Sequence, residues 1–247
     1  MADSPVVTDV LMPLMDLTGV AEAAEQAREE IDRLLAHNRL RRNSAPVSAE
    51  AALRGAHASA ALEGAAYDLE AVRAGAVTNT VVQGALRVSG ALGSLVDTWA
   101  VAPRQVLARL HLLAARDTVE ESRLGRPDFE EPARLDALMD LLTGPTEVPA
   151  VIVSAVVQGE LLAMKPFPGP NGLVARAAGR LVLVQRGLDP KAVSVPDAGH
   201  FAREPEYRGA AATYATGTAD GVRAWLRHCC AAIAAGAAEG RAICDLV

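Results

Sequence analysis

A long apolar segment at residues 148–164 constrains the fold more than any other feature of the sequence. Its valine and isoleucine content favours a β-strand, but ordinary strands run to about 5–6 residues, and this segment is far longer. Length therefore favours a helix. Ser154, Gln158 and Glu160 interrupt the apolar run, which makes it too short and too polar to span a membrane. We predict a buried helix in a soluble protein.

A shortage of aromatic residues indicates how the rest of the core is built. Apolar residues make up 51% of the 247 residues, mostly as alanine, valine and leucine, whereas aromatic residues make up 3%. Alanine and leucine favour helices, and small aliphatic side chains allow helices to pack closely. We therefore expect an all-α fold, a bundle of about eight or nine helices with at most a short β-hairpin.

Helical periodicity and capping residues place the helices along the chain. The expected helices cover residues 17–38, 48–64, 79–100, 103–116, 132–142, 148–164 and 172–187, and two more begin near Glu206 and Thr218. Asp68 is expected to cap a short helical turn that Gly75 ends. This pattern predicts an N-terminal tail and surface helix in residues 1–45 and one helical domain in residues 46–247.

Several segments are expected to interrupt the helices. The first dozen residues are expected to be a loosely held terminus. Residues 43–47, which contain Pro46, should break the chain between the first two helices, and Ser48 is the expected cap of the second. Residues 124–131 and a loop that includes His200 are expected to be irregular.

Charge and cysteine usage exclude several classes of partner. The net charge is −6 and the sequence pI is near 5.4, which argues against nucleic acid or an anionic membrane as a partner. The three cysteines show neither metal-site spacing nor an even disulfide set, and the N-terminus has no signal-peptide pattern. These features predict a cytoplasmic protein with reduced thiols.

The loop between the two apolar helices carries the residues that suggest chemistry. It reads Lys-Pro-Phe-Pro-Gly-Pro-Asn-Gly-Leu-Val-Ala-Arg from Lys165 to Arg176. A loop that enters a helix N-terminus presents free N–H groups and the positive end of the helix dipole, which suits a phosphate. Gly172 permits close backbone approach, and Arg176 lies one turn into the helix, where a guanidinium can bind two phosphate oxygens. Asn171, Gly172 and Arg176 are the predicted phosphate-binding residues.

This loop resembles the catalytic loop of the Fic (Fido) family, whose motif reads His-Pro-Phe-x-(Asp/Glu)-Gly-Asn-Gly-Arg-x-x-Arg. Pro166, Phe167, Asn171, Gly172 and Arg176 match the motif. Proteins of that family usually transfer AMP from ATP to a hydroxyl group of a target protein. The resemblance implies the family's helical fold and a nucleotide site at residues 165–176, with Pro166 and Phe167 anchoring the loop.

A second motif lies upstream of the loop. Ser59-Ala-Ala-Leu-Glu63-Gly64 is similar to the inhibitory motif of the same family, (Ser/Thr)-x-x-x-Glu-(Gly/Asn). The resemblance implies that the helix at residues 48–64 carries an inhibitory glutamate, Glu63, which pairs with Arg176 and obstructs the γ-phosphate of ATP. A salt bridge that only ties two helices together is the competing interpretation of the same pair.

Four positions of the loop depart from the family pattern. Lys165 stands in place of the general-base histidine, and a lysine is ordinarily protonated at neutral pH. Gly169 replaces the carboxylate that holds Mg²⁺, Pro170 removes a backbone N–H, and Leu173 replaces the first arginine. Losing the base alone costs about 10²–10⁴ in rate, so we expect a pseudoenzyme without normal AMP transfer.

Three functions remain open on the sequence alone. The first is a regulator that binds a nucleotide or another anion, with ATP as a candidate ligand, no certain cofactor, and Mg²⁺ disfavoured. The second is a nucleotidyltransferase with altered chemistry that uses Lys165 in place of the histidine and acts on a protein or small-molecule hydroxyl. The third is an interaction module with an unidentified protein partner or a homodimer. His57 and His200 have no second ligand at metal-site spacing and are assigned to surface or packing roles, and His111 and His228 are assigned as ordinary residues of apolar helices.

Overall fold

The computed structural model describes residues 9–128 and 132–247, and these residues form an all-α fold. They contain twelve α-helices and two short 3₁₀-helices, and no strand occurs in these two ranges. The all-α prediction is confirmed. The predicted count of eight or nine was too low because α2 (Asn38–Arg42) and α10 (Pro196–Ala202) are too short to produce a hydrophobic period, and α4 (Leu69–Arg73) was expected only as a short turn and not counted.

The other elements follow in chain order. They are η1 (Met12–Asp16), α1 (Val20–Leu35), α3 (Ala45–Leu62), α5 (Thr80–Val101), α6 (Pro103–Ala115), η2 (Glu121–Arg123), α7 (Pro132–Thr143), α8 (Ala150–Met164), α9 (Asn171–Gln185), α11 (Glu204–Tyr214) and α12 (Ala219–Leu246).

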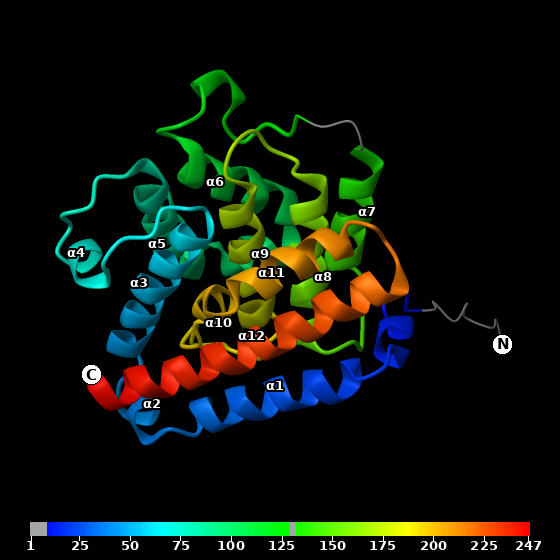
Figure 1. The fold of residues 1–247 in the computed structure, drawn as a ribbon, viewed down its shortest axis with the longest axis horizontal. Coiled ribbons are helices and arrows are strands. Elements are labelled where there is room, and N and C mark those ends of the chain that lie inside the picture. The colour runs from blue at the N-terminus through cyan, green and yellow to red at the C-terminus, as the bar shows by residue number, and fades with distance from the viewer. Residues whose placement is uncertain (1–8, 129–131) are drawn as a thin grey trace.

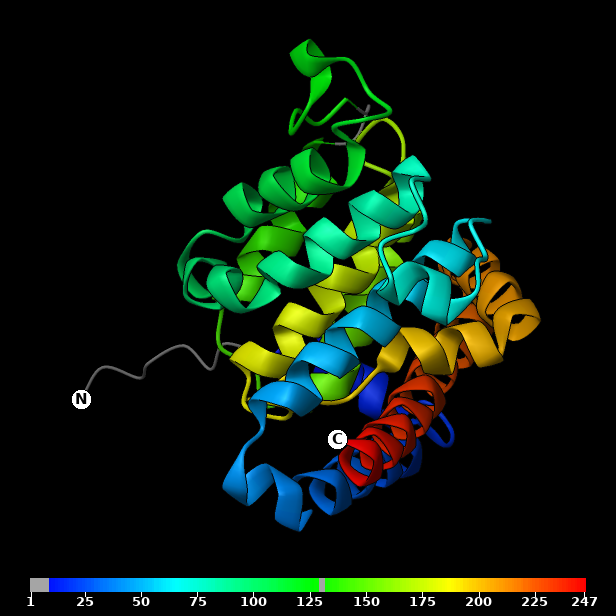
Figure 2. The same ribbon diagram turned by 90° about the vertical axis from the view of Figure 1, so that its left-hand side faces the viewer.

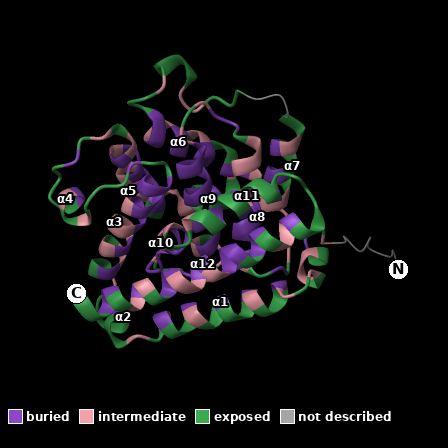
Figure 3. Ribbon diagram, in the orientation of Figure 1, coloured by how far each residue is buried: buried purple, intermediate pink, exposed green. Residues whose placement is uncertain are grey.

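Helices α8 and α9 form the centre of the molecule. The buried part of α8 runs from Val151 to Gly159, and that of α9 from Asn171 to Leu183, as Figure 3 shows. Helices α5 and α6 cover one side of this pair, and α12 with α1 alongside it covers the other (Figure 1, Figure 2). The long apolar segment is therefore a core helix, as its length predicted.

Small residues set how closely the helices approach. A Cβ added to Gly199 of α10 would lie 2.0 Å from the carbonyl oxygen of Ala232 on α12. A Cβ added to Gly84 of α5 would lie 2.3 Å from the carbonyl oxygen of Ala114 on α6. Both distances are too short for any side chain, so backbone contact at glycine replaces the packing that large aromatic residues would supply.

A break occurs within residues 43–47, as predicted, because Asn43 and Ser44 separate α2 from α3, but the part assigned to Pro46 was wrong. Helix α3 begins at Ala45 after Ser44 and carries Pro46 in its first turn. Proline is tolerated there because the first N–H groups of a helix have no intrahelical partner. Ser48 does not cap the helix; its hydroxyl donates to the carbonyl oxygens of Ser44 at 3.1 Å and Lys191 at 2.8 Å.

The predicted loop at His200 was also wrong. His200 lies in α10, which begins at Pro196, and only 1% of its surface is exposed. The short turn after Asp68 was predicted correctly, since the Asp68 carboxylate accepts from the N–H of Ala71 at 3.0 Å and Gly75 has a φ of 70°. No described helix is both long enough and apolar enough to cross a membrane.

The expected loose terminus is only partly within the described residues. Residues 1–8 lie outside them, as do residues 129–131 of the segment expected to be irregular. Asp9 accepts hydrogen bonds from the Thr146 hydroxyl at 2.7 Å and the Glu147 N–H at 3.0 Å, and Leu11 is buried. The chain is therefore anchored from Asp9 onward, which the lack of a periodic pattern in this stretch did not indicate.

Candidate functional site

The loop between α8 and α9 begins with a strained residue. Lys165 ends α8 in the left-handed conformation, with φ 48° and ψ 58°, and its side chain is exposed. This backbone conformation is uncommon for a residue with a side chain. Gly169 also has a positive φ, of 86°, and there the absence of a Cβ removes the strain.

Asn171 holds the loop in shape. Its side-chain oxygen accepts from the N–H of Phe167 at 3.0 Å, and its side-chain nitrogen donates to the carbonyl oxygens of Phe167 at 2.5 Å and Gly169 at 3.3 Å. All three hydrogen bonds of the Asn171 side chain are to the loop backbone, so its position supports a role in holding the loop conformation. Its predicted part in phosphate binding stays a prediction.

Phe167 anchors the loop in the core through a histidine. Its ring is 4% exposed and stacks on His111 of α6, with the ring centroids 4.6 Å apart. His111 Nδ1 accepts from the N–H of Gly125 at 2.9 Å, so Nε2 carries the proton and donates to the carbonyl oxygen of Pro168 at 2.8 Å. Burial lowers the pKa of His111, which favours this neutral form. The sequence pattern placed His111 on a helix but did not link it to the loop.

Arg176 is the centre of a buried network. Its Nε donates to the Ser59 hydroxyl at 2.8 Å, and its Nη2 donates to the Ser59 carbonyl and to Glu63 Oε1, both at 2.9 Å. Its Nη1 donates to the Tyr207 hydroxyl at 2.9 Å, and Asp197 Oδ1 lies 3.6 Å from Nε. Burial lowers the pKa of Arg176, but Tyr207, Glu63 and Asp197 together outweigh it, and the net shift is upward.

Glu63 lies over the N-terminus of α9. It caps the C-terminus of α3, and Gly64 follows it with a φ of 87°. A Cβ added to Gly172 would lie 1.9 Å from Glu63 Oε1, so the carboxylate rests directly against the backbone of this glycine. The N-terminus of a helix favours a negative charge. Glu63 therefore occupies the position where an external anion would bind.

A cleft of about 680 Å³ opens beside this contact. Lys165, Arg176 and Arg208 line it with positive charge, together with residues of α3, the loop and α11. Arg208 had not been singled out from the sequence, because an arginine in a polar helix carries no distinctive signal. Its Nη2 donates to the carbonyl oxygen of Leu62 at 3.0 Å, which ties α11 to the end of α3. The volume suits a small-molecule ligand.

The cleft is poorly suited to a divalent cation. Of the described residues that line it, Glu63 is the one carboxylate, and its Oε1 is bonded to Arg176. Gly169 and Pro170 offer no side-chain ligand in the loop. Within residues 9–128 and 132–247, no group of three or more histidine, cysteine, aspartate or glutamate side chains could hold a metal. The residues present do not fit Mg²⁺.

Two histidines pack behind Arg176. His200 Nδ1 and His228 Nε2 are 3.0 Å apart, and both rings stack on Trp225 and contact the Tyr207 ring at a tilt. His228 Nδ1 lies 3.1 Å from Glu206 Oε1 but makes no well-aligned hydrogen bond to it. Burial lowers the pKa of both histidines. The sequence predicted a surface or packing role for His200 and an ordinary helix position for His228, and the structure places both in the core.

Comparison with known proteins gives the fold but no close relative. No family model and no curated protein matches the chain. A Fic family protein from Desulfovibrio desulfuricans G20 superposes with a TM-score of 0.75 at 20% identity, covering 91% of this chain and 74% of that one. Fic-1 (residues 134–508) from C. elegans superposes with a TM-score of 0.74 at 16% identity, covering 95% and 75%. The chain therefore has the fold of Fic family proteins.

Proposed function

We propose that this Fic-like protein is a regulator that binds the phosphate groups of a nucleotide, ATP being the candidate, without performing normal AMP transfer. The proposal rests on the position of the Glu63 carboxylate. It contacts the backbone of Gly172 and accepts a hydrogen bond from Arg176 at the N-terminus of α9. A carboxylate held there by the protein itself indicates that the site selects negative charge.

Ligand binding would exchange one anion for another. The Glu63 side chain is 24% exposed, and a Cβ added to the neighbouring Gly64 would meet nothing within 4 Å. Both residues line the cleft, so a phosphate that displaces the Glu63 side chain can leave it in contact with solvent. The ligand would then receive hydrogen bonds from Arg176 and the first turn of α9, while Lys165 and Arg208 supply further positive charge from the walls of the cleft.

The residues at the catalytic positions argue against transfer. A base must accept a proton, but the ammonium group of Lys165 has three donors and no acceptor. Within the described part of the chain, the Lys165 side chain makes no hydrogen bond or ion pair that would orient it toward a substrate hydroxyl. The cleft also lacks the carboxylates that would position a metal ion against the phosphate charge.

One observation favours the alternative, a transferase with altered chemistry. Lys165 is exposed at the cleft and holds a left-handed backbone conformation that is costly for a residue with a Cβ. Strain of this kind occurs more often at functional sites. In this alternative Lys165 would act on a protein or small-molecule hydroxyl, and loss of product formation in Lys165→Gly would be its signature.

Calorimetric titration of ATP in the presence of EDTA tests the proposal. We expect Glu63→Ala to bind ATP roughly 10- to 100-fold more tightly than the unaltered protein, because one charge-assisted hydrogen bond no longer competes. The matched control is Glu70→Ala, which removes an exposed glutamate of α4 and should leave the affinity unchanged.

Two further variants separate loss of the site from loss of the fold. The first is the double variant Glu63→Ala with Arg176→Ala, which removes both charges of the buried pair. The second is Glu63→Ala with Arg208→Ala, which keeps Arg176 and its other hydrogen bonds in the core. Both should weaken ATP binding relative to Glu63→Ala. Equal affinity in all variants, or no binding in any folded variant, would contradict the proposal. Mass spectrometry should detect no AMP transfer by the same proteins, and a product that requires Lys165 would favour the alternative.

A further inference from the structure

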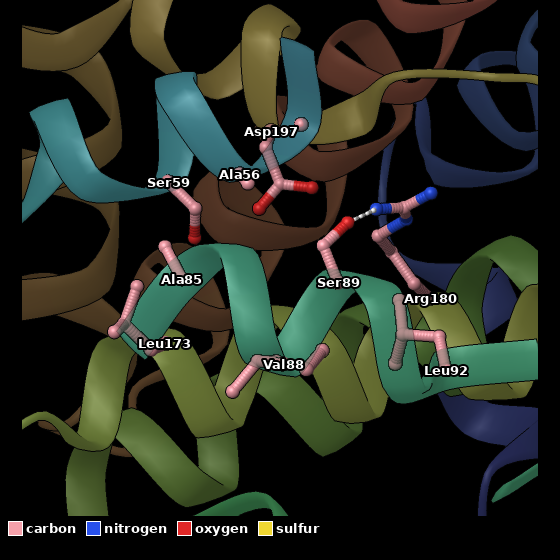
Figure 4. A pocket seen from close by; sticks show the side chains of 11 residues that line it. Ala56, Ser59, Ala85, Val88, Ser89, Leu92, Leu173, Arg180 and Asp197 are labelled. Atoms are coloured by element: carbon pink, nitrogen blue, oxygen red, sulfur yellow. Dashed lines mark hydrogen bonds between the residues drawn. The ribbon is translucent and has the colours of Figure 1, made fainter. Parts of the chain in front are cut away.

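A buried arginine outside this cleft has almost no partner. Arg180 of α9 is 8% exposed, and its one side-chain hydrogen bond within the described residues is to the Ser89 hydroxyl, at a long 3.4 Å (Figure 4). No described carboxylate lies within the 4.0 Å that defines an ion pair. A guanidinium has five N–H donors, and charged groups are rarely buried this deeply without an opposite charge. The structure therefore leaves most of its donors unused.

The contrast with Arg176 shows that this is not general to α9. Arg176 lies one helical turn earlier and has four hydrogen bonds to oxygen acceptors. Arg180 instead extends past Gly55 of α3, where an added Cβ would lie 2.9 Å from its Nη1. The glycine thus makes room for the guanidinium. Asp197 Oδ2 lies 3.7 Å from the same added Cβ, but it makes no direct ion pair with Arg180.

A groove of about 550 Å³ lies on the outer side of Arg180. On the inner side is a cavity of about 10 Å³, lined by Ser59, Ser89 and Asp197 among others (Figure 4). That cavity has room for about one water molecule. A counter-ion larger than water must therefore approach from the groove, which runs between α3, α5 and α9.

The lining of the groove is largely apolar. Its larger apolar residues are Leu92, Val96, Leu181, Val184 and Pro190. Gly90 and Gly93 of α5 also line it, and a Cβ added to either would meet nothing within 4 Å. Glycine inside a helix is destabilising relative to alanine. Here its effect is to keep the groove open.

We propose that this groove binds a small carboxylate with an apolar body, the carboxylate on Arg180 and the apolar part along the walls. A planar carboxylate matches the guanidinium, which can donate two parallel hydrogen bonds to it. One buried positive charge balances one negative charge, whereas a phosphate monoester would bring excess charge into an apolar groove. The second cation of the lining, Lys191, is exposed and already donates to the carbonyl oxygen of Leu40 at 2.8 Å. This site shares no lining residue with the cleft at Glu63.

Thermal unfolding and calorimetric titration with octanoate test the site. Two matched compounds are the controls, because octanol has the apolar chain without the charge and inorganic phosphate has the charge without the chain. We expect octanoate to bind and to raise the Tm, and neither control to do so. Binding of phosphate in place of octanoate would overturn the proposal, as would no binding of octanoate.

Variants assign the binding to the groove. Arg180→Met should weaken the binding of octanoate roughly 10- to 100-fold, because one or two charge-assisted hydrogen bonds are lost. Its own Tm should not fall, because the side chain that it removes is an unpaired buried charge. Gly90→Leu combined with Gly93→Leu should fill the groove, keep the fold and abolish binding. Lys191→Met is the matched control and should bind as the unaltered protein does. Equal octanoate affinity in Arg180→Met or in the double leucine variant would refute the assignment.

Discussion

Replacing Gly172 by alanine should act on the protein through Glu63. The added Cβ would lie 1.9 Å from Glu63 Oε1, a separation that no side chain tolerates, and 3.0 Å from Arg176 Nη1. The second contact needs a shift of only a few tenths of an ångström, whereas the first requires the carboxylate to leave. We expect the alanine to expel Glu63 from the N-terminus of α9 and to break its bond to Arg176.

The magnitude follows from two opposing contributions. Loss of the charge-assisted hydrogen bond between Glu63 and Arg176 costs about 1.5–3 kcal/mol. Alanine in place of glycine in the first turn of α9 gains about 0.5–1 kcal/mol. The net loss should be about 1–2 kcal/mol in the free energy of unfolding. For a chain of this length, that corresponds to a Tm lowered by about 2–8 °C.

Denaturant unfolding of four proteins measures this effect as a double-mutant cycle. They are the unaltered protein, Gly172→Ala, Glu63→Ala and the double variant. In the Glu63→Ala background the clashing carboxylate is absent, so adding Gly172→Ala should leave only the gain in helix propensity and raise the free energy of unfolding by about 0.5–1 kcal/mol. Gly90→Ala, at a helical glycine with open space around it, is the control for propensity alone and should stabilise the protein. An equal loss in both Glu63 backgrounds would refute the reasoning.

Three other properties should follow from buried groups. Burial is the main cause of the lowered pKa values of His200 and His228, so these residues bind protons more readily in the unfolded chain than in the folded one. The stability present above about pH 6.5 should therefore be lost as the pH falls below that value, by up to about 1.4 kcal/mol per pH unit for each histidine. Denaturant midpoints measured across this pH range test the prediction. His200→Phe should flatten that slope, and a pH-independent stability would contradict the prediction. Burial raises the pKa of the Cys230 thiol to about 12 and that of Cys229 well above its usual range, so a thiol reagent at mildly alkaline pH should label them only after unfolding. Phe167→Ala should cost about 3–5 kcal/mol in unfolding free energy, and a loss below about 1 kcal/mol would show that the stack on His111 does not anchor the loop.

Features with a local physical signature were predictable from the sequence. The segment at 148–164 was assigned correctly because its length excludes a strand, and Asp68 and Gly75 because capping chemistry acts within one turn. Pro46 shows the limit of the same reasoning. Proline breaks a helix in its interior but begins one in its first turn, and the sequence around Pro46 does not say which position it holds.

The candidate site was predictable where the resemblance to the two Fic family motifs covers it. The two motifs indicated that Glu63 and Arg176 would meet, and they lie 2.9 Å apart. The parts that depend on packing between distant helices were not predictable. Arg208 reaches the end of α3 from α11, and His111 reaches the loop from α6, and neither relation leaves a periodic or motif signal in the sequence.

Arg176 and Arg180 illustrate the same limit within a single helix. They are four residues apart, so both project toward the same side of α9, and helical periodicity does not distinguish them. Their surroundings differ because α3 crosses that side with Ser59 and Glu63 opposite the first arginine and with Gly55 opposite the second. Ser59 and Glu63 satisfy the charge of Arg176 within the protein, whereas Gly55 only makes space for that of Arg180. A difference in side chains on α3 thus separates a residue held by the protein from one that is left to bind a ligand.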